Sequence, residues 1–152
     1  MSNPTKWYRF KELPEDIQNR LKRLPELLSR EGALLAYLFG SMARHGSGQD
    51  IDLALMMPVG KRPFHLHQTM VDFLDTERID IVDLRRATPV LRFEIMSTGH
   101  CIFAADDTIQ ADSELAWLRE YKDTAWLRRR QEILLKEKLK QWSLDAKASP
   151  ND

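Results

Sequence analysis

The sequence predicts an α+β fold, close to α/β in character, in which helices pack against a small mixed β-sheet. Short apolar runs alternate with segments of helical periodicity through the first two thirds of the chain, and the last third has helical character alone. The length of 152 residues is typical of one domain with a core of its own. We therefore expect a single domain over residues 1–152, with a long C-terminal helix.

The first expected element is a helix over about residues 13–31. Five apolar residues recur there at helical spacing: Ile17, Leu21, Leu24, Leu27 and Leu28. Pro25 lies inside this pattern, so we expect a kink or a split at that point. Gly32 ends the pattern, as glycine often does just past a helix C-terminus.

The middle of the chain, about residues 33–104, is expected to hold the sheet. Apolar runs bounded by Gly and Pro predict four strands, at 33–39, 51–57, 78–84 and 100–103. The first run is continuously apolar, which is typical of a strand buried on both faces. Helices are expected between the strands, at 64–74 and 88–97. Thr88 would cap the second helix, with Pro89 in its first turn.

The C-terminal part predicts one long helix, over about residues 112–142, opened by Asp112 or Ser113. Its apolar residues allow two interpretations. The helix packs on its own sheet, or the part from Trp126 onward meets another chain, with the arginines 128–130 at the rim of that interface.

Composition excludes several classes of protein. Lys and Arg together number 23, as do Asp and Glu, so no bulk field draws the chain to nucleic acid or to an anionic membrane. We expect no direct nucleic-acid binding. The one cysteine, Cys101, allows no internal disulfide and fits a reducing compartment. The chain lacks a signal-like N-terminus and any apolar run of membrane-spanning length, so we expect a cytoplasmic location.

The segment from Gly40 to Leu55 contains the residues most indicative of chemistry. Gly40 and Ser41 directly follow an apolar run. Glycine lets a phosphate approach the backbone, and Ser41 would offer both an N–H and a hydroxyl. Arg44 follows three residues later and could reach the same phosphates, although an exposed arginine or a structural ion pair would also explain it.

Two aspartates open the next apolar run. Asp50 and Asp52 are two residues apart, so in a strand they point to one face with Cα atoms about 6–7 Å apart. Two carboxylates at this separation repel each other unless a cation lies between them. Mg²⁺ prefers carboxylate and phosphate oxygens, and two such ions could serve a displacement at phosphorus. This pair therefore predicts a magnesium site beside a phosphate-binding turn.

These motifs, with a later strand that carries aspartate, resemble the DNA polymerase β-like nucleotidyltransferases. More narrowly, the chain is similar to the minimal nucleotidyltransferases, the MntA-type antitoxins that accompany HEPN-domain toxins. The segment Ile79–Ala87 resembles the third-carboxylate strand of that group. Glu120–Asp123 and Leu127–Arg130 resemble its C-terminal helix. The resemblance runs from about Leu35 to Arg130, which is most of the chain.

The resemblance implies a role for each candidate residue. Gly40 and Ser41 would bind the triphosphate of ATP, and Asp50 and Asp52 would hold magnesium. Asp80 would complete the metal site as the third carboxylate.

Asp83 competes with Asp80 for this role. The two have opposite parity along the strand, so only one can face the site. Asp80 lies between two isoleucines, where an unpaired charge would be costly. Asp83 lies near the strand end, where solvent or Arg85 could satisfy it. Asp80 is therefore the preferred candidate.

One loop departs from the family pattern. The spacer from Met42 to Gln49 has eight residues, fewer than is usual in the family, and Gln49 occupies a position where serine is common. Gly46 and Gly48 would let the shorter loop turn tightly. The change could alter which nucleotide fits, or weaken activity, while leaving the carboxylate geometry intact.

The function implied by the resemblance is Mg²⁺-dependent transfer of AMP from ATP to a hydroxyl, a tyrosine, of a partner HEPN ribonuclease toxin, which neutralises the toxin. Chain and toxin could form a hetero-oligomer. One alternative is a non-catalytic antitoxin that acts by binding the toxin. Another is a small-molecule nucleotidyltransferase, although such enzymes usually have an additional helical domain.

Overall fold

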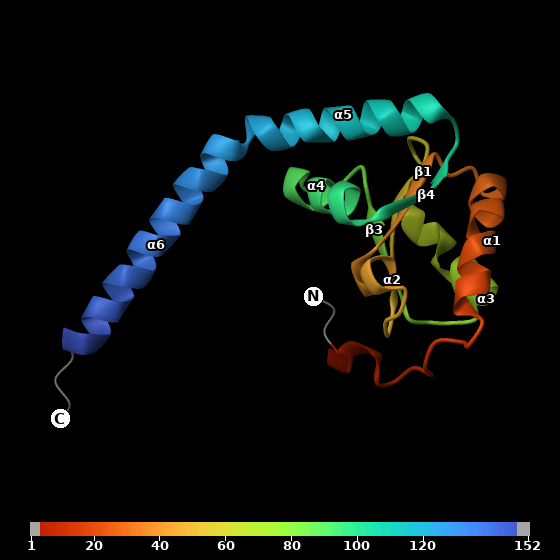
Figure 1. Ribbon diagram of the computed structural model, residues 1–152, viewed down its shortest axis with the longest axis horizontal. Helices are drawn as coiled ribbons and strands as arrows, with labels where there is room; N and C mark the ends of the chain where they lie inside the picture. The colour runs from red at the N-terminus through yellow and green to blue at the C-terminus, as the bar shows by residue number, and fades with distance from the viewer. Residues whose placement is uncertain (1–3, 149–152) are drawn as a thin grey trace.

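The computed structural model describes residues 4–148, and within them the chain forms one four-stranded sheet (Figure 1). Its strands are β1 Leu35–Phe39, β2 Ile51–Met56, β3 Ile79–Asp83 and β4 His100–Ala104. The spatial order is β3-β2-β1-β4. β1 is antiparallel to both β2 and β4, whereas β2 and β3 are parallel. The expected mixed sheet is confirmed, and each strand lies within about two residues of its expected position.

Helices cover both faces of this sheet. In chain order they are η1 Pro4–Trp7, α1 Ile17–Arg30, α2 Gly40–His45, η2 Pro63–Leu66, α3 His67–Leu74, α4 Pro89–Thr98, α5 Asp107–Asp123 and α6 Ala125–Ala148. α1 and α3 pack on one face, and α4 and α5 on the other (Figure 1). The described helices include none long and apolar enough to cross a membrane.

The central strand β1 divides the core into two layers. Ala36 packs with apolar residues of α1 and α3, whereas Leu35 and Tyr37 pack with Ile95 of α4 and Trp117 of α5. The alternation of side chains along a strand sends neighbours to opposite faces, and here both faces are covered. The expectation of a strand buried on both sides is therefore confirmed.

Pro25 does not split the first helix. α1 runs without a break from Ile17 to Arg30 with Pro25 inside it. Leu24 and Leu28, on either side of the proline, are fully buried against the sheet. Tertiary packing of the apolar face therefore holds the helix together across the position where one backbone hydrogen bond is lost.

The prediction of a single helix over 112–142 was wrong about the residue at which the helix begins. α5 begins at Asp107, because the side chain of Asp106 accepts the backbone N–H of Ile109 at 2.8 Å and caps the first turn. The same carboxylate accepts the hydroxyl of Thr108 at 2.6 Å. Asp112 and Ser113, the expected openers, both lie inside the helix.

The same expectation was also wrong about continuity, because the helix breaks at Thr124. The Tyr121 carbonyl accepts the Thr124 hydroxyl at 3.1 Å and the Arg128 guanidinium at 2.8 Å. Arg128 also lies over the Tyr121 ring, 3.7 Å from its centroid, and the Phe93 ring of α4 stacks at 3.9 Å. The side chains of Thr124 and Arg128 therefore donate to a carbonyl that would accept a backbone N–H in a continuous helix. These contacts hold the junction between α5 and α6.

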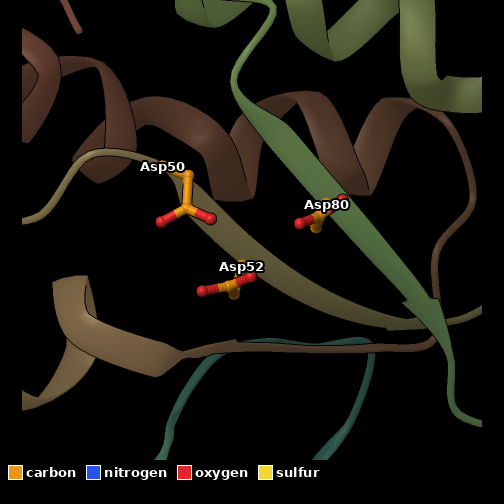
Figure 2. A group of neighbouring side chains, drawn as sticks. All are labelled: Asp50, Asp52 and Asp80. Atoms are coloured by element: carbon orange, nitrogen blue, oxygen red, sulfur yellow. The ribbon is translucent and has the colours of Figure 1, made fainter. Parts of the chain in front are cut away.

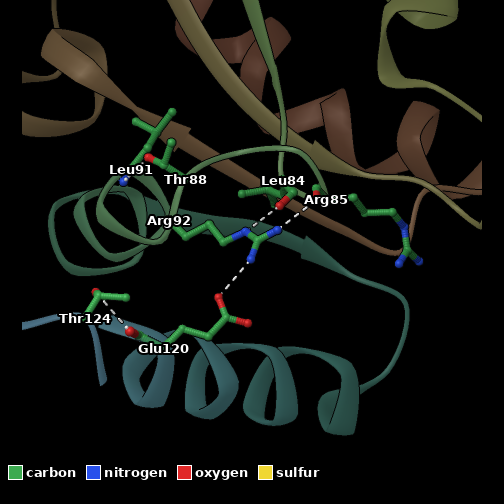
Figure 3. A network of polar contacts seen from close by, with 7 residues as sticks. All are labelled: Leu84, Arg85, Thr88, Leu91, Arg92, Glu120 and Thr124. Atoms are coloured by element: carbon green, nitrogen blue, oxygen red, sulfur yellow. Dashed lines mark hydrogen bonds and ion pairs between the residues drawn. The ribbon is translucent and has the colours of Figure 1, made fainter. Parts of the chain in front are cut away.

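A second set of contacts holds α4 against α5 (Figure 3). Arg92 donates to the carbonyls of Leu84 at 2.7 Å and Arg85 at 2.8 Å, and pairs with Glu120 of α5 at 2.9 Å. One guanidinium thus joins the end of β3, α4 and α5. Because the distal part of α4 lines the site described below, this network fixes one wall of that site.

α6 does not pack on the sheet. It extends away from the rest of the chain (Figure 1), and its described residues include none that is buried. Trp126 is 64% exposed and Trp142 is 67% exposed. Of the two interpretations of the C-terminal helix, packing on the chain's own sheet therefore applies to α5 alone.

Candidate functional site

The Gly-Ser turn lies where β1 ends and α2 begins. Gly40 has φ +71°, a conformation that favours glycine, and it is the first residue of α2. Ser41 follows in the first turn of this short helix. The expected turn between strand and helix is therefore present, and its backbone N–H groups lie at a helix start.

The shortened spacer closes through its two glycines. Gly46 ends α2 with φ +69° and donates its N–H to the carbonyl of Met42 at 3.0 Å. Gly48 packs so closely to Ser41 that an added Cβ would lie 3.2 Å from the Ser41 Cβ. The loop thus folds back onto the Gly-Ser turn and delivers Asp50 to the start of β2.

Three carboxylates meet beside this turn (Figure 2). Asp52 of β2 and Asp80 of β3 are direct partners in the parallel register, and Asp50 directly precedes β2. One oxygen from each of the three lies within 4.8 Å of the other two. Asp83 lies instead at the end of β3, where Oδ1 accepts the backbone N–H of Arg85 at 2.9 Å.

The environment of these carboxylates disfavours a full set of negative charges. Burial of Asp52, together with the charges of Asp50 and Asp80, raises the pKa of its carboxyl to about 6. Asp50 is only 2% exposed. A divalent cation would relieve this repulsion, and carboxylate oxygens are ligands that Mg²⁺ prefers. The donor set therefore fits a magnesium ion.

Two residues near the N-terminus also contact the cluster. Trp7 donates its indole N–H to Oδ2 of Asp50 at 2.9 Å, and the ammonium of Lys6 lies 2.5 Å from Oδ1 of Asp80. Sequence reasoning missed both residues. They lie 43 and 74 positions from the aspartates they contact, and no motif or periodicity links them to the site.

A cavity of about 280 Å³ adjoins the cluster. It is lined by Phe39, Gly40, Ser41, Arg44, Asp52, Asp80, Val82, Glu94 and Thr98. Five of the six candidate residues thus share one cavity. The sixth, Asp50, lies beneath the surface against Trp7. Glu94 and Thr98 come from α4 and were not foreseen, because an exposed Glu and Thr on a helix give no signal in a single sequence.

A larger cavity of about 570 Å³ lies elsewhere, between residues 9–12 and residues 71–77. It contains none of the candidate residues. A choice of site by cavity volume alone would therefore select a cavity that does not contain the carboxylates. The smaller cavity is the better candidate for nucleotide chemistry, because it joins the Gly-Ser turn to the acidic cluster.

On this sheet, two members of the acidic cluster and the Gly-Ser turn line one cavity, an arrangement that suits nucleotide chemistry. Residues 16–108 match the family described as "Polymerase beta, Nucleotidyltransferase". Because this match covers more than half of the chain, the chain belongs to the polymerase beta nucleotidyltransferase family. The resemblance inferred from the motifs is confirmed at this level.

Solved structures share the fold. One is described as a tri-AMPylated Shewanella oneidensis HEPN toxin in complex with MNT antitoxin. The matching chain is 24% identical with a TM-score of 0.60, and the match covers 81% of this chain and 98% of that one. Another is described as a toxin-antitoxin with AMP-PNP. It is 23% identical with a TM-score of 0.62, covering 80% and 98%.

A third, described as the toxin-antitoxin MntA-HepT, is 24% identical with a TM-score of 0.58, covering 80% and 98%. No curated protein sequence matches the chain. At these identities the solved structures establish the fold alone.

Proposed function

We propose that this chain is a Mg²⁺-dependent adenylyltransferase that transfers AMP from ATP to a tyrosine hydroxyl of a HEPN-type toxin and so neutralises it. The main support is the meeting of Asp50, Asp52 and Asp80 within 4.8 Å, with two of the three lining the cavity that contains the Gly-Ser turn. The solved complexes with a similar fold support the choice of partner and of transferred group.

The residues around the cavity have distinct roles in this proposal. The backbone N–H groups of Gly40 and Ser41 would bind phosphate oxygens at the start of α2, and the Arg44 guanidinium would neutralise them. Bound at the three aspartates, magnesium would balance the triphosphate charge and lower the pKa of the acceptor hydroxyl.

The reaction needs no protein nucleophile. The acceptor oxygen forms a bond to the α-phosphorus, the bond to pyrophosphate breaks, and the hydroxyl proton passes to solvent.

α6 would supply the surface for the toxin. Leu135, Leu139 and Trp142 are exposed and lie on one face of the helix, at spacings i, i+4 and i+7. The helix contains seven Lys or Arg residues and three Asp or Glu residues. Two copies of α6 would therefore repel each other, and an apolar partner helix flanked by acidic residues fits better.

The test is to incubate the purified chain with ATP, Mg²⁺ and the protein encoded by the adjacent gene, and then to weigh that protein. We expect a gain of one or more AMP units. Asp80→Asn should reduce the rate about 100-fold or more, whereas Asp83→Asn, three residues along the same strand, should retain it. A mass gain that is equal with Asp80→Asn would exclude the proposed site.

A second candidate function is neutralisation by binding alone, which the exposed face of α6 favours. The double variant Asp50→Asn/Asp52→Asn separates the two functions in cells that express the toxin. Loss of protection, with the complex still formed in a pull-down, supports transfer. Full protection supports binding alone.

A further inference from the structure

The N-terminal residues Lys6 and Trp7 contact the carboxylate cluster in two different ways. Trp7 is 4% exposed and donates its indole N–H to Oδ2 of Asp50, which is itself buried. The side chain of Lys6 is 51% exposed and reaches Oδ1 of Asp80 from the solvent side. One contact is thus part of the folded interior, and the other lies at its surface.

The segment that holds these residues is fastened to the loop before Asp50. Arg78, which is largely buried, donates to the carbonyl of Phe10 at 2.8 Å and to the carbonyl of Gln49 at 3.2 Å. The Phe10 ring lies 5.9 Å from the Trp7 ring, and the Phe10 N–H donates to the Trp7 carbonyl at 3.0 Å. Trp7 is therefore held in place independently of its bond to Asp50.

The Lys6 ammonium places a positive charge beside the three aspartates. Its ammonium contacts Asp80 and lies 4.7 Å from the centroid of the Trp7 ring, so it has two favourable contacts. It offsets one of the negative charges that a metal ion would otherwise balance. Its side chain is long and half exposed, so it can leave without disturbing the core.

We propose that Lys6 and Trp7 control divalent-cation binding at this site: the Lys6 ammonium competes with the cation for Asp80, and Trp7 positions the Asp50 carboxylate to receive it. The proposal rests on the proposed function, because it takes the three aspartates to be a metal site. Lys6 leaves when the cation arrives, whereas Trp7 stays.

The experiment is calorimetric titration of the full-length chain with Mn²⁺, without nucleotide. Lys6→Met keeps the length and removes the charge, so it should bind Mn²⁺ about two- to fivefold more tightly, as expected for an exposed ion pair. Lys11→Met is the matched control. It removes the same charge from the same segment at a residue that lines the other cavity, and its affinity should equal that of the wild type.

Trp7→Phe tests the positioning role, because phenylalanine fills the space without the N–H. We expect weaker Mn²⁺ binding, by about tenfold or more, with a melting curve that remains cooperative. The double variant Lys6→Met/Trp7→Phe shows whether the two effects are independent. If they are, its change in the logarithm of Kd equals the sum of the two single changes.

The outcomes separate this proposal from the proposed function. If the wild type binds Mn²⁺ and Lys6→Met binds no more tightly than Lys11→Met, the control by Lys6 is wrong and the metal site stands. If Trp7→Phe folds and binds Mn²⁺ as the wild type does, the role of Trp7 is wrong. If neither the wild type nor Lys6→Met binds Mn²⁺, both the inference and the proposed metal site are wrong.

Discussion

The carboxylate of Asp52 fills the space next to Gly40 that any side chain at position 40 would need. The two residues meet because Phe39, just before Gly40, is the register partner of Asp52 across β1 and β2. The glycine of the Gly-Ser turn thus makes room for a carboxylate of the acidic cluster. The turn and the cluster form one structural unit.

Gly40→Ala should therefore destabilise the chain by more than backbone strain alone. A left-handed conformation costs an L-residue about 1–2 kcal/mol, and overlap with Asp52 adds to this. Gly46→Ala is the matched control, since Gly46 has nearly the same φ and an added Cβ there would meet no atom within 4 Å. Urea denaturation should show the larger loss for Gly40→Ala. Adding Asp52→Ala should reduce the cost of Gly40→Ala but not that of Gly46→Ala, and an equal cost in both backgrounds would contradict the contact.

The pH dependence of stability should reflect Asp52. Burial and the neighbouring charges raise the pKa of its carboxyl to about 6 from an ordinary value near 4. The native state therefore holds more protons than the unfolded chain between about pH 4 and 6, and stability falls as pH rises through this window.

Asp52→Asn removes this loss, so at pH 7.5 the variant should be more stable than the wild type by about 1 kcal/mol, after allowance for solvent screening. The gain should vanish near pH 4. Thermal denaturation in chelator, with Asp83→Asn as the control, measures it. A gain that persists unchanged at pH 4 would point to packing instead of charge.

Arg44 should contribute to nucleotide affinity. It lines the cavity with Gly40 and Ser41 and is exposed, so its removal should leave the fold intact. Arg44→Ala should weaken binding of a non-hydrolysable ATP analogue about tenfold, as expected for loss of a charge-assisted hydrogen bond. Calorimetry checks this against Arg62→Ala, which removes an exposed arginine away from the cavity. Equal affinities for the two variants would mean that Arg44 is an exposed arginine that does not contribute to nucleotide binding.

α6 should be needed for complex formation but not for folding. Leu139→Glu/Trp142→Glu places two charges on the apolar face and should abolish co-purification of the proposed toxin partner, with stability changed by less than about 0.5 kcal/mol. Gln141→Glu/Ala148→Glu adds the same charge on the opposite side of the helix, where both residues are exposed, and should retain the complex. If both pairs of substitutions abolish it equally, net charge and not the apolar face governs binding.

Strand parity was enough to place the acidic pair from sequence. Asp50 and Asp52 alternate with Ile51 and Leu53, which are fully buried, so the pattern fixes the face on which the carboxylates lie. Parity also showed that only one of Asp80 and Asp83 can face the site, and the two isoleucines beside Asp80 favoured that residue. The structure places Asp80, and not Asp83, in the cluster with Asp52. The alternation of side chains between the two faces of a strand involves neighbouring residues only, so it can be recognised in a single sequence.

The parts that could not be predicted depend on contacts between distant residues. The helix break at Thr124 results from the stacking of Phe93, Tyr121 and Arg128, and no Gly or Pro marks it. The roles of Lys6 and Trp7 require the fold to bring the N-terminus to β2 and β3. Neither feature has a local signature.

The parallel pairing of β2 with β3 has a consequence for folding. A slip of one residue would set Ile79 or Ile81 opposite Asp52 and turn Asp80 to the other face. Parallel strands pair across a long connection, here through α3, and such non-local pairing forms slowly. A cation held by all three aspartates would bind only the correct register, and by mass action it would enrich that register over every slipped alternative.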